Sequence, residues 1–294
     1  MGVFQSNILQ NKIKKFGGIE KILLEYNSGK SLKNINSISG IGCKTLSKLI
    51  KENGCELRSD SEKTRKYCLN QNSFDVLNEE SVYWIGFIMG DGSIVKTGKE
   101  FAVLTIALNS KDVSHLEKFK KFINTDKPLH FQKNHNTYLI TINSKYICDR
   151  LYSFGIINRK SYNATEKKNI PENLEKHYWR GLIDADGHLR YDKKYDKWYI
   201  GLTGSYTLCS QFFEYITKKL FFKSKTVVRQ VSKNGYRVEF GGKKLPLKII
   251  ECLYCDSNIY LDRKFSTYLE SKKYISENEV ILNAQFNWKM ELEW

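Results

Sequence analysis

The 294-residue sequence has no apolar run of about 18 residues, which is the length that a membrane-spanning helix needs. Its N-terminus lacks the apolar core of a secretory signal peptide. Its seven cysteines are odd in number and have no framework spacing, which is typical of free thiols in a reducing compartment. The sequence therefore argues against a membrane or secreted protein and predicts an intracellular location.

Acidic residues are also in short supply, with 32 Asp and Glu against 48 Lys and Arg and a formal net charge of +16. Such an excess favours a polyanionic partner, with nucleic acid as the first candidate and an anionic membrane surface as the second. Cys252 and Cys255 form a single CxxC pair, and without a second pair at matching spacing we expect no zinc site.

The first 70 residues hold 13 basic and 6 acidic side chains and contain the stretch GKSLKNINSISGIGCKTLSKLIKENG, residues 29–54. Ser31 is a plausible N-cap, and Gly40–Gly42 predict a turn between two short helices. Such a pair resembles a helix-turn-helix, with Lys44, Lys48 and Lys51 on its second helix facing DNA. Two alternatives stay open, a helix-hairpin-helix that grips phosphates through backbone N–H groups and a plain helical bundle. We place this domain at residues 1–58 and a linker at 59–80.

From residue 81 onward the sequence indicates a diverged duplication. The string YWIGFIMGDGSI at 83–94 returns as YWRGLIDADGHL at 178–189, and Asp91 and Asp186 stand 95 residues apart. Each string is followed by strand, strand, helix, strand, strand and helix patterns. Two copies of this length predict two similar halves, at residues 81–170 and 171–294, rather than a solenoid.

If the two strings are helices, small residues lie on one face of each, at Gly86 and Gly90 in the first and at Gly181 and Ala185 in the second. Small residues at this spacing allow two helix backbones to approach closely. We therefore expect the two helices to pack against each other at the junction between the halves.

Each of these helices ends with an acid before a glycine, Asp91–Gly92 and Asp186–Gly187. A carboxylate at a helix C-terminus is unfavourable by about 0.3–1 kcal/mol, and two neighbouring carboxylates repel each other. A bound divalent cation would reverse both effects, so Asp91 and Asp186, with the adjoining Gly90 and Ala185, are candidate metal-binding residues. The alternative is that the aspartates only shape Asp-Gly turns.

The strings LIDADG at 182–187 and WIGFIMGDG at 84–92 resemble the motifs of the LAGLIDADG homing endonucleases in their single-chain, two-motif form. The resemblance implies an α+β fold in which two pseudo-symmetric αββαββα halves form a DNA-binding saddle, preceded by a small α-helical domain. It implies that Asp91 and Asp186 bind Mg²⁺, or another divalent cation such as Mn²⁺, and activate water to cut both DNA strands. It also implies that Lys160 and Lys264 lie near the scissile phosphates. The first string departs from the motif, because Met89 replaces the earlier of its two acids. The second string keeps that acid as Asp184.

Double-stranded DNA is the expected partner, and the charged or amide side chains on and between the predicted strands are its candidate contacts. These candidates are Lys96, Lys99, Gln132, Lys133, Arg190, Lys193, Lys194, Lys197, Arg229, Gln230, Lys233 and Arg237. Two unlike halves predict a long, imperfectly palindromic site read by a monomer. An intron RNA maturase and a catalytically inactive DNA-binding regulator are the alternative functions, and the presence of both aspartates favours cleavage over either.

Overall fold

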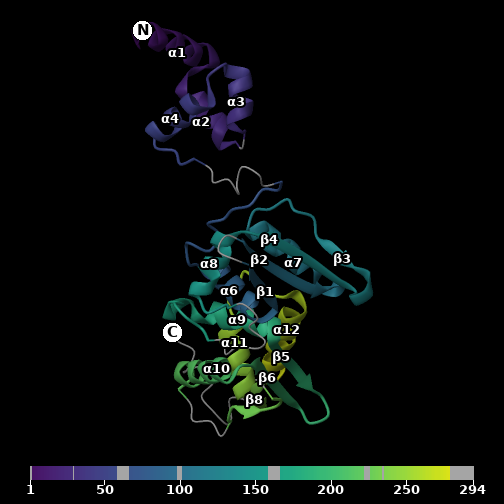
Figure 1. Ribbon diagram of the computed structural model, residues 1–294. Helices are drawn as coiled ribbons and strands as arrows, with labels where there is room; N and C mark the ends of the chain where they lie inside the picture. Colours follow the sequence, from purple (N-terminus) through teal and green to yellow (C-terminus); the bar gives the residue numbers. More distant parts are fainter. Residues whose placement is uncertain are drawn as a thin grey trace. The chain divides into compact units, whose positions relative to one another are not determined.

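The computed structural model describes residues 2–28, 30–57, 66–97, 101–157, 166–221, 226–233 and 235–278 (Figure 1). The chain divides into two compact units, Met1–Tyr67 and Cys68–Trp294. Each unit has its own hydrophobic core. No helix within the described ranges is long and apolar enough to cross a membrane.

The first unit is helical, and its described part contains four helices. The Ser31 side chain caps one of them by accepting a hydrogen bond from the Asn34 N–H at 3.1 Å. Gly40 ends that helix in the left-handed conformation, with φ of 66°, and so makes the predicted turn. The core includes Ile22, Ile35 and Leu46. The helices are α1 (Gly2–Phe16), α2 (Gly18–Asn27), α3 (Leu32–Ser39) and α4 (Cys43–Glu52).

The prediction of a linker at residues 59–80 is wrong for its second part, because the second unit begins at Cys68. The Phe74 side chain is fully buried in the core of the second unit, and the Asn70 N–H donates to the Ile123 carbonyl at 2.8 Å. Residues 68–80 were predicted to be a linker because most of them are polar. The buried Phe74 ring and the hydrogen bond of Asn70 attach this stretch to the first half.

The first half of the second unit has the predicted order αββαββα. Asn78 begins its first helix with a capping box, in which Asn78 and Ser81 each accept the other's backbone N–H at 2.9 Å. Glu79 and Glu80 follow in the first turn, where negative charge favours a helix. The elements are α6 (Glu79–Asp91), β1 (Gly92–Thr97), β2 (Phe101–Asn109), α7 (Val113–Phe122), β3 (His130–Gln132), β4 (Thr137–Asn143) and α8 (Lys145–Ser153).

The second half repeats this order and adds a helix at its end. A 3₁₀ turn at Glu172–Leu174 leads into its first helix. The elements are α9 (Glu175–Asp186), β5 (Gly187–Asp192), β6 (Lys197–Gly204), α10 (Tyr206–Lys219), β7 (Arg229–Gln230), β8 (Tyr236–Gly242), α11 (Leu245–Tyr254) and α12 (Asp262–Glu277).

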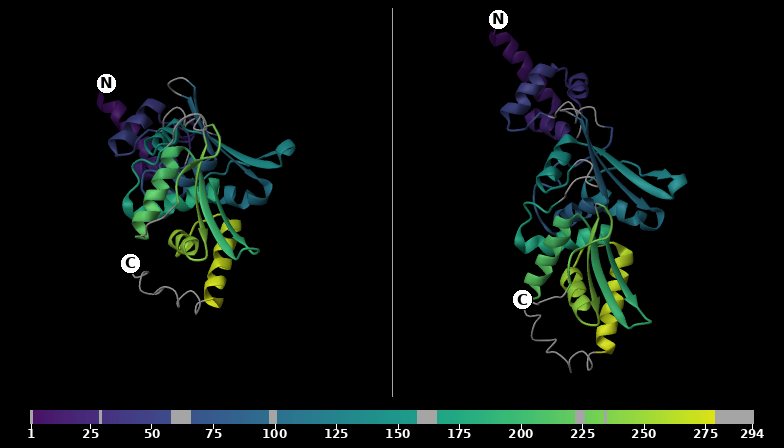
Figure 2. Two further views of the ribbon diagram at one scale, coloured as in Figure 1. Left: turned by 90° about the horizontal axis from the view of Figure 1, so that it is seen from below. Right: turned by 60° about the horizontal axis from the view of Figure 1, so that its bottom comes forward.

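The two sheets have the same antiparallel topology, with orders β1-β2-β4-β3 and β5-β6-β8-β7. Alternate residues of each strand point to opposite faces. Leu104 and Ile142 pair on the buried face of the first sheet, and Ile200 and Phe240 pair on that of the second. The helices of each half pack on this buried face and leave the other face open (Figure 2). These observations confirm the predicted α+β class with two αββαββα halves.

Candidate functional site

The two glycine-bearing helices, α6 and α9, pack against each other between the two sheets (Figure 1). A Cβ atom added at Gly86 would lie 2.0 Å from the carbonyl oxygen of Tyr178, and one added at Gly181 would lie 2.1 Å from that of Tyr83. Both distances are far below van der Waals contact, so the helix backbones touch here. Glycine at both positions is what lets the helices meet.

Both helices end at the acids that the sequence singles out, Asp91 in α6 and Asp186 in α9. A Cβ atom added at Gly90 would lie 2.3 Å from the Cβ atom of Ala185 and 3.2 Å from the Oδ2 atom of Asp186. The Asp186 carboxylate therefore lies beside the last turn of α6, at the same end of the helix pair as Asp91.

Lys264, in the first turn of α12, reaches the C-terminal end of α9. Its side chain is buried, and its Nζ atom donates hydrogen bonds to the carbonyl groups of Ile183, Asp184 (2.8 Å) and Gly187 (2.7 Å). The last carbonyls of a helix lack partners within the helix, and a cation near them is favourable. Lys264 thereby offsets part of the unfavourable charge that the sequence analysis assigned to this helix end.

Lys264 also shows that the two motif acids share one electrostatic environment. Burial lowers the pKa of Lys264 to about 8, and the carboxylates of Asp184, Asp91 and Asp186 act against that change. Both motif acids thus favour the charged form of this amine. The three hydrogen bonds of Lys264 all go to backbone, so this geometry indicates a positioning role, and the predicted contact with a scissile phosphate stays a prediction.

Asp184, the earlier acid of the second motif, lies in the core rather than beside Asp186. Its carboxylate accepts hydrogen bonds from the hydroxyl groups of Tyr83 (2.7 Å) and Tyr254 (2.5 Å) and from the Leu261 N–H (2.7 Å). Burial raises the pKa of Asp184, while Lys264 and these hydrogen bonds oppose the change. Asp184 therefore joins α6 of the first half to α11 and to the start of α12 in the second.

The corresponding position in the first half shows the opposite arrangement. Met89 is equivalent to Asp184, and Tyr178 is equivalent to Tyr83, because the members of each equivalent pair are 95 residues apart. The Tyr178 hydroxyl is buried and has no hydrogen-bond partner among the described residues. The Tyr83 hydroxyl, in contrast, also contacts the Nε2 atom of His115 at 3.0 Å. Burial lowers the pKa of His115 to about 3, so this imidazole is neutral.

A second polar connection joins the halves at the other end of the motif helices. The fully buried Arg180 of α9 donates from Nη2 to Glu79 Oε1 at 2.8 Å, and its Nε and Nη1 atoms donate to the carbonyls of Ile259 and Leu253, each at 3.0 Å. The Asn258 side chain and backbone also donate to Glu79. Sequence reasoning missed this pair, although an arginine inside an otherwise apolar helix is a signal for a buried partner.

The donor atoms at the acidic end fit a hydrated divalent cation. Within the part of the chain that the structure describes, no three His, Cys, Asp or Glu side chains form a metal-binding cluster. Mg²⁺ is commonly held by only one or two carboxylates, with water and substrate phosphate completing its ligands. Asp91 and Asp186 can supply those carboxylates, and the backbone carbonyls of Gly90 and Ala185 are further candidate ligands. Because Gly90 has no side chain, nothing at this position of α6 fills the space beside the Asp186 carboxylate.

The predicted DNA contacts of the second half fall into two groups. Arginines lie on the open face of the sheet, at Arg190 in β5, Arg229 in β7 and Arg237 in β8. Lysines are exposed at the hairpin ends, in the β5–β6 turn (Lys193 and Lys194), at the start of β6 (Lys197) and in the β7–β8 turn (Lys233). Gln230 faces the other way, alongside Tyr236, and donates to the Lys233 carbonyl at 3.1 Å.

In the first half the structure contradicts one predicted contact. Lys96 pairs in register with Ala102, which is buried on the helix-covered face. Its Nζ atom donates to Asp149 Oδ1 at 2.5 Å and lies 3.7 Å from the centre of the Tyr152 ring. This position argues against the predicted contact of Lys96 with DNA. A shift of one residue in register moves a strand side chain to the other face.

The other predicted residues of the first half divide by position. Gln132 lies on the open face of β3 and pairs with Thr137, and Lys133 follows in the β3–β4 connection. Lys99 and Lys160 lie outside the described residues. In the first unit, Lys44, Lys48 and Lys51 are exposed along α4, and Lys48 lies 3.7 Å from Glu52.

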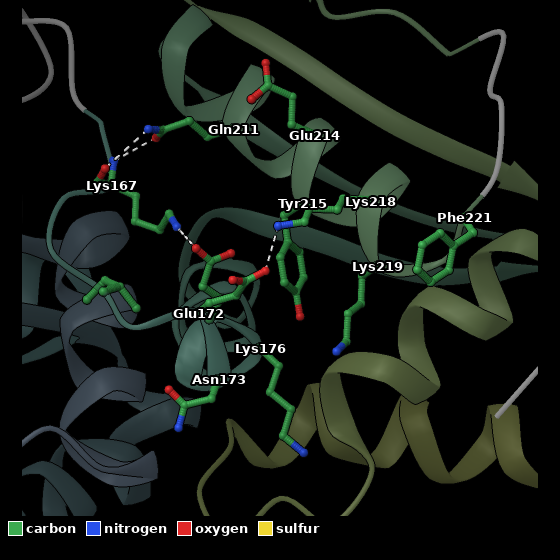
Figure 3. Close-up of a pocket in the computed structure, with 12 residues that line it drawn as sticks. Lys167, Glu172, Asn173, Lys176, Gln211, Glu214, Tyr215, Lys218, Lys219 and Phe221 are labelled. Carbon is green, nitrogen blue, oxygen red and sulfur yellow. Dashed lines mark hydrogen bonds and ion pairs between the residues drawn. The ribbon is translucent and has the colours of Figure 1, made fainter. Parts of the chain in front are cut away.

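A surface hollow of about 570 Å³ lies in the second half between the start of α9 and α10 (Figure 3). Two of its lysines are paired with acids, Lys167 with Glu175 and Lys218 with Glu172. It lies at the opposite end of α9 from Asp186, about 16 Å along the helix at 1.5 Å per residue. The hollow is lined by both lysines and glutamates, and it lies apart from the acidic site.

No family model matches the sequence. An alignment that covers 67% of this chain is 25% identical to a DNA polymerase of Acanthamoeba polyphaga mimivirus, and it spans only 12% of that protein. Several solved structures are similar, including the following three. The LAGLIDADG homing endonuclease I-LtrWI bound to target DNA has 14% identity and a TM-score of 0.45, covering 68% of this chain and 93% of that one.

The other two are I-SmaMI bound to uncleaved DNA in the presence of calcium ions (13% identity, TM-score 0.44, 69% and 93% covered) and the LAGLIDADG meganuclease I-AabMI bound to uncleaved DNA (13%, 0.47, 69% and 92%). At these sequence identities and TM-scores, the similarity does not assign a function to any residue of this chain. The chain's own architecture is more informative, since two αββαββα halves meet through glycine-faced helices that carry the motif and end in aspartates. The second unit therefore has the LAGLIDADG fold in its single-chain, two-motif form.

Proposed function

We propose that the protein is a site-specific double-strand DNA endonuclease of the LAGLIDADG homing endonuclease family, which uses Mg²⁺ or another divalent cation. The observation that carries this proposal is the placement of Asp91 and Asp186 at one end of a backbone-to-backbone helix pair. Two carboxylates at the same end of a helix pair, in a protein of net charge +16, are suited to a cation that contacts a phosphodiester.

The protein's own part in the reaction is to fix the positions of the two acids. A bound divalent cation lowers the pKa of attacking water and offsets charge on the attacking and leaving oxygens. Asp91 and Asp186 would hold this cation, and the contact at Gly86 and Gly181 fixes how closely the two helices approach. Lys264 fixes the last turn of α9 through its hydrogen bonds to backbone carbonyls. Rigid placement of this kind lowers the barrier because little rearrangement remains to be made.

The open faces of the two sheets are the proposed DNA surface. An antiparallel β-ribbon fits the major groove, where base edges can be read. Arginines on the strands are then placed for base contacts, and lysines at the hairpin ends are placed for phosphate contacts. Phosphate contacts position a protein on DNA, so the lysines would set the register and the arginines would read the sequence.

The test uses plasmid DNA that carries the sequences flanking the gene, joined together. We expect the full chain to linearise this plasmid with Mg²⁺ and to leave it intact with EDTA. Asp91→Asn and Asp186→Asn should each lower the cleavage rate by about 100-fold or more, because each removes charge from the site where the reaction is stabilised. Asp149→Asn, on the helix-covered side of the first half, is the matched control and should cut normally.

Other outcomes would support the alternative functions. Tight binding of the plasmid without cleavage would favour the DNA-binding regulator. Stimulated splicing of an intron RNA that persists in Asp91→Asn and Asp186→Asn would favour the maturase.

A further inference from the structure

The open faces of the two sheets differ in chemistry. On the first sheet the register pairs Val95 with Val103, Thr105 with Thr141, and Ala107 with Leu139. Val95 is 49% exposed although it is apolar. Among the strand side chains described on this face there is no Lys, Arg, Asp or Glu. Its hydrogen-bonding groups are hydroxyls, a histidine and the amides of residues such as Gln132 and Asn143.

The open face of the second sheet is charged. Arg190, Arg229 and Arg237 lie on it with Glu239, and Arg229 and Arg237 are directly paired across β7 and β8. The Glu239 carboxylate lies 2.7 Å from the Nε2 atom of His188 and 3.8 Å from Arg229. No comparable set of charges exists on the described strands of the first sheet.

Two of these arginines are held by neighbours on the same face. The Arg190 guanidinium lies over the Tyr199 ring, 4.0 Å from its centre. Arg237 donates from Nε to the Thr203 hydroxyl at 3.2 Å, and that contact does not use its two terminal nitrogens. A guanidinium restrained in this way loses little freedom when it forms two parallel hydrogen bonds.

The two faces therefore suit different bases. In the major groove arginine makes paired hydrogen bonds to guanine, asparagine and glutamine make them to adenine, and apolar side chains contact the thymine methyl group. A face of valine, alanine, leucine, threonine and amides offers contacts to A·T pairs. A face with three arginines offers contacts to guanine, and Glu239 offers an acceptor for the cytosine amino group.

We propose that the two sheets read half-sites of different base composition: the first sheet an A·T-rich half-site, recognised largely through thymine methyl groups, and the second a half-site that contains guanines. This inference rests on the proposed function, because it takes the open faces as the DNA surface. The target is then asymmetric in composition as well as in sequence.

The test is a selection from DNA duplexes with a random central segment, bound by the full chain in EDTA so that the DNA stays intact. We expect a consensus with a guanine-containing half and an A·T-dominated half. Arg237→Lys keeps the positive charge but loses the paired hydrogen bonds, so preference for guanine at one position should fall by about 10-fold or more. Arg190→Lys should do the same at a second position in the same half.

Lys193→Ala is the matched control, because Lys193 lies at a hairpin end. It should weaken binding to all duplexes alike and leave the consensus unchanged. A consensus with guanines in both halves, or one that neither arginine variant alters, overturns this inference while leaving the endonuclease proposal in place. Failure to select any sequence overturns both.

Discussion

Asp184 in the second half and Met89 in the first occupy equivalent positions, two residues before the terminal acid of each motif helix. Both are buried. Asp184 accepts three hydrogen bonds and joins three elements, whereas Met89 is a side chain of the apolar core and leaves the Tyr178 hydroxyl without a partner among the described residues. The same backbone frame thus holds a polar network on one side and an apolar contact on the other.

This difference shows which positions the frame constrains. Where the helices touch, both halves have glycine, because no other residue fits between the two backbones. Where the helices end, both have aspartate. Elsewhere along α6 and α9, and across the open faces of the two sheets, the halves have diverged in charge and polarity without a change of topology.

Asp184→Ala should produce the largest difference between the halves. It would leave the buried Tyr254 hydroxyl without its acceptor and the Tyr83 hydroxyl with only His115 as a partner. The buried ammonium group of Lys264 would lose one of its counter-charges. Removing one partner of a buried charged network costs about 3–5 kcal/mol. Met89→Leu, the equivalent site in the first half, should cost less than about 1.5 kcal/mol because it conserves volume and polarity. Urea unfolding monitored by circular dichroism measures both, and equal losses would remove the contrast.

Gly86→Ala should lower the free energy of unfolding by about 1–3 kcal/mol or more, because the new methyl group would overlap the Tyr178 carbonyl. Gly181→Ala should do the same from the other half. Gly204→Ala is the matched control, since its Cβ atom would make only an ordinary contact, 3.5 Å from Leu208. If Gly86→Ala were as stable as Gly204→Ala, the close approach of the helices would be wrong.

Tyr83 and Tyr178, which occupy equivalent positions, should show a smaller difference in stability between the halves. Tyr83→Phe removes a hydroxyl that donates to Asp184, so we expect a loss of about 1–3 kcal/mol in the free energy of unfolding. Tyr178→Phe removes a buried hydroxyl with no described partner, so stability should be unchanged or rise by up to about 1 kcal/mol. Thermal and urea unfolding of the two variants, measured side by side, would refute the asymmetry if both lost stability equally.

Lys96→Ala should have the smallest effect. Because Lys96 contacts Asp149 and Tyr152 on the helix-covered face, the dependence of log K for DNA on log salt concentration should be unchanged. Lys193→Ala, at a hairpin end, should reduce that slope by about 0.9. Fluorescence anisotropy over a range of salt concentrations makes the comparison. A reduced slope for Lys96→Ala would show that Lys96 contacts DNA phosphate.

Periodicity and repetition in the sequence were enough to predict the helix pair, its glycine contact and the order of elements in both halves. Those features depend on local patterns and on steric requirements that a few residues express. The register of β1 could not be predicted, because a short strand with apolar and polar residues on both faces does not identify its buried side. For this reason the sequence did not show that Lys96 lies on the helix-covered face.

Buried polar networks were also beyond reach from the sequence. Asp184 was identified as the retained acid of the motif, but its partners Tyr254 and Leu261 lie 70 and 77 residues away. Lys264 was predicted near the site, yet its hydrogen bonds go to backbone carbonyls, which carry no sequence signal. The positions of these buried polar groups depend on tertiary packing, which the structure shows and the sequence does not.

The ion pair between Glu79 and Arg180 makes the joining of the halves directional. The position equivalent to Arg180 in the first half is Ile85, and the position equivalent to Glu79 in the second is Leu174. If either half paired with a copy of itself, a charged group would be enclosed opposite an aliphatic side chain. We therefore expect separately produced halves to associate with each other and not to form homodimers.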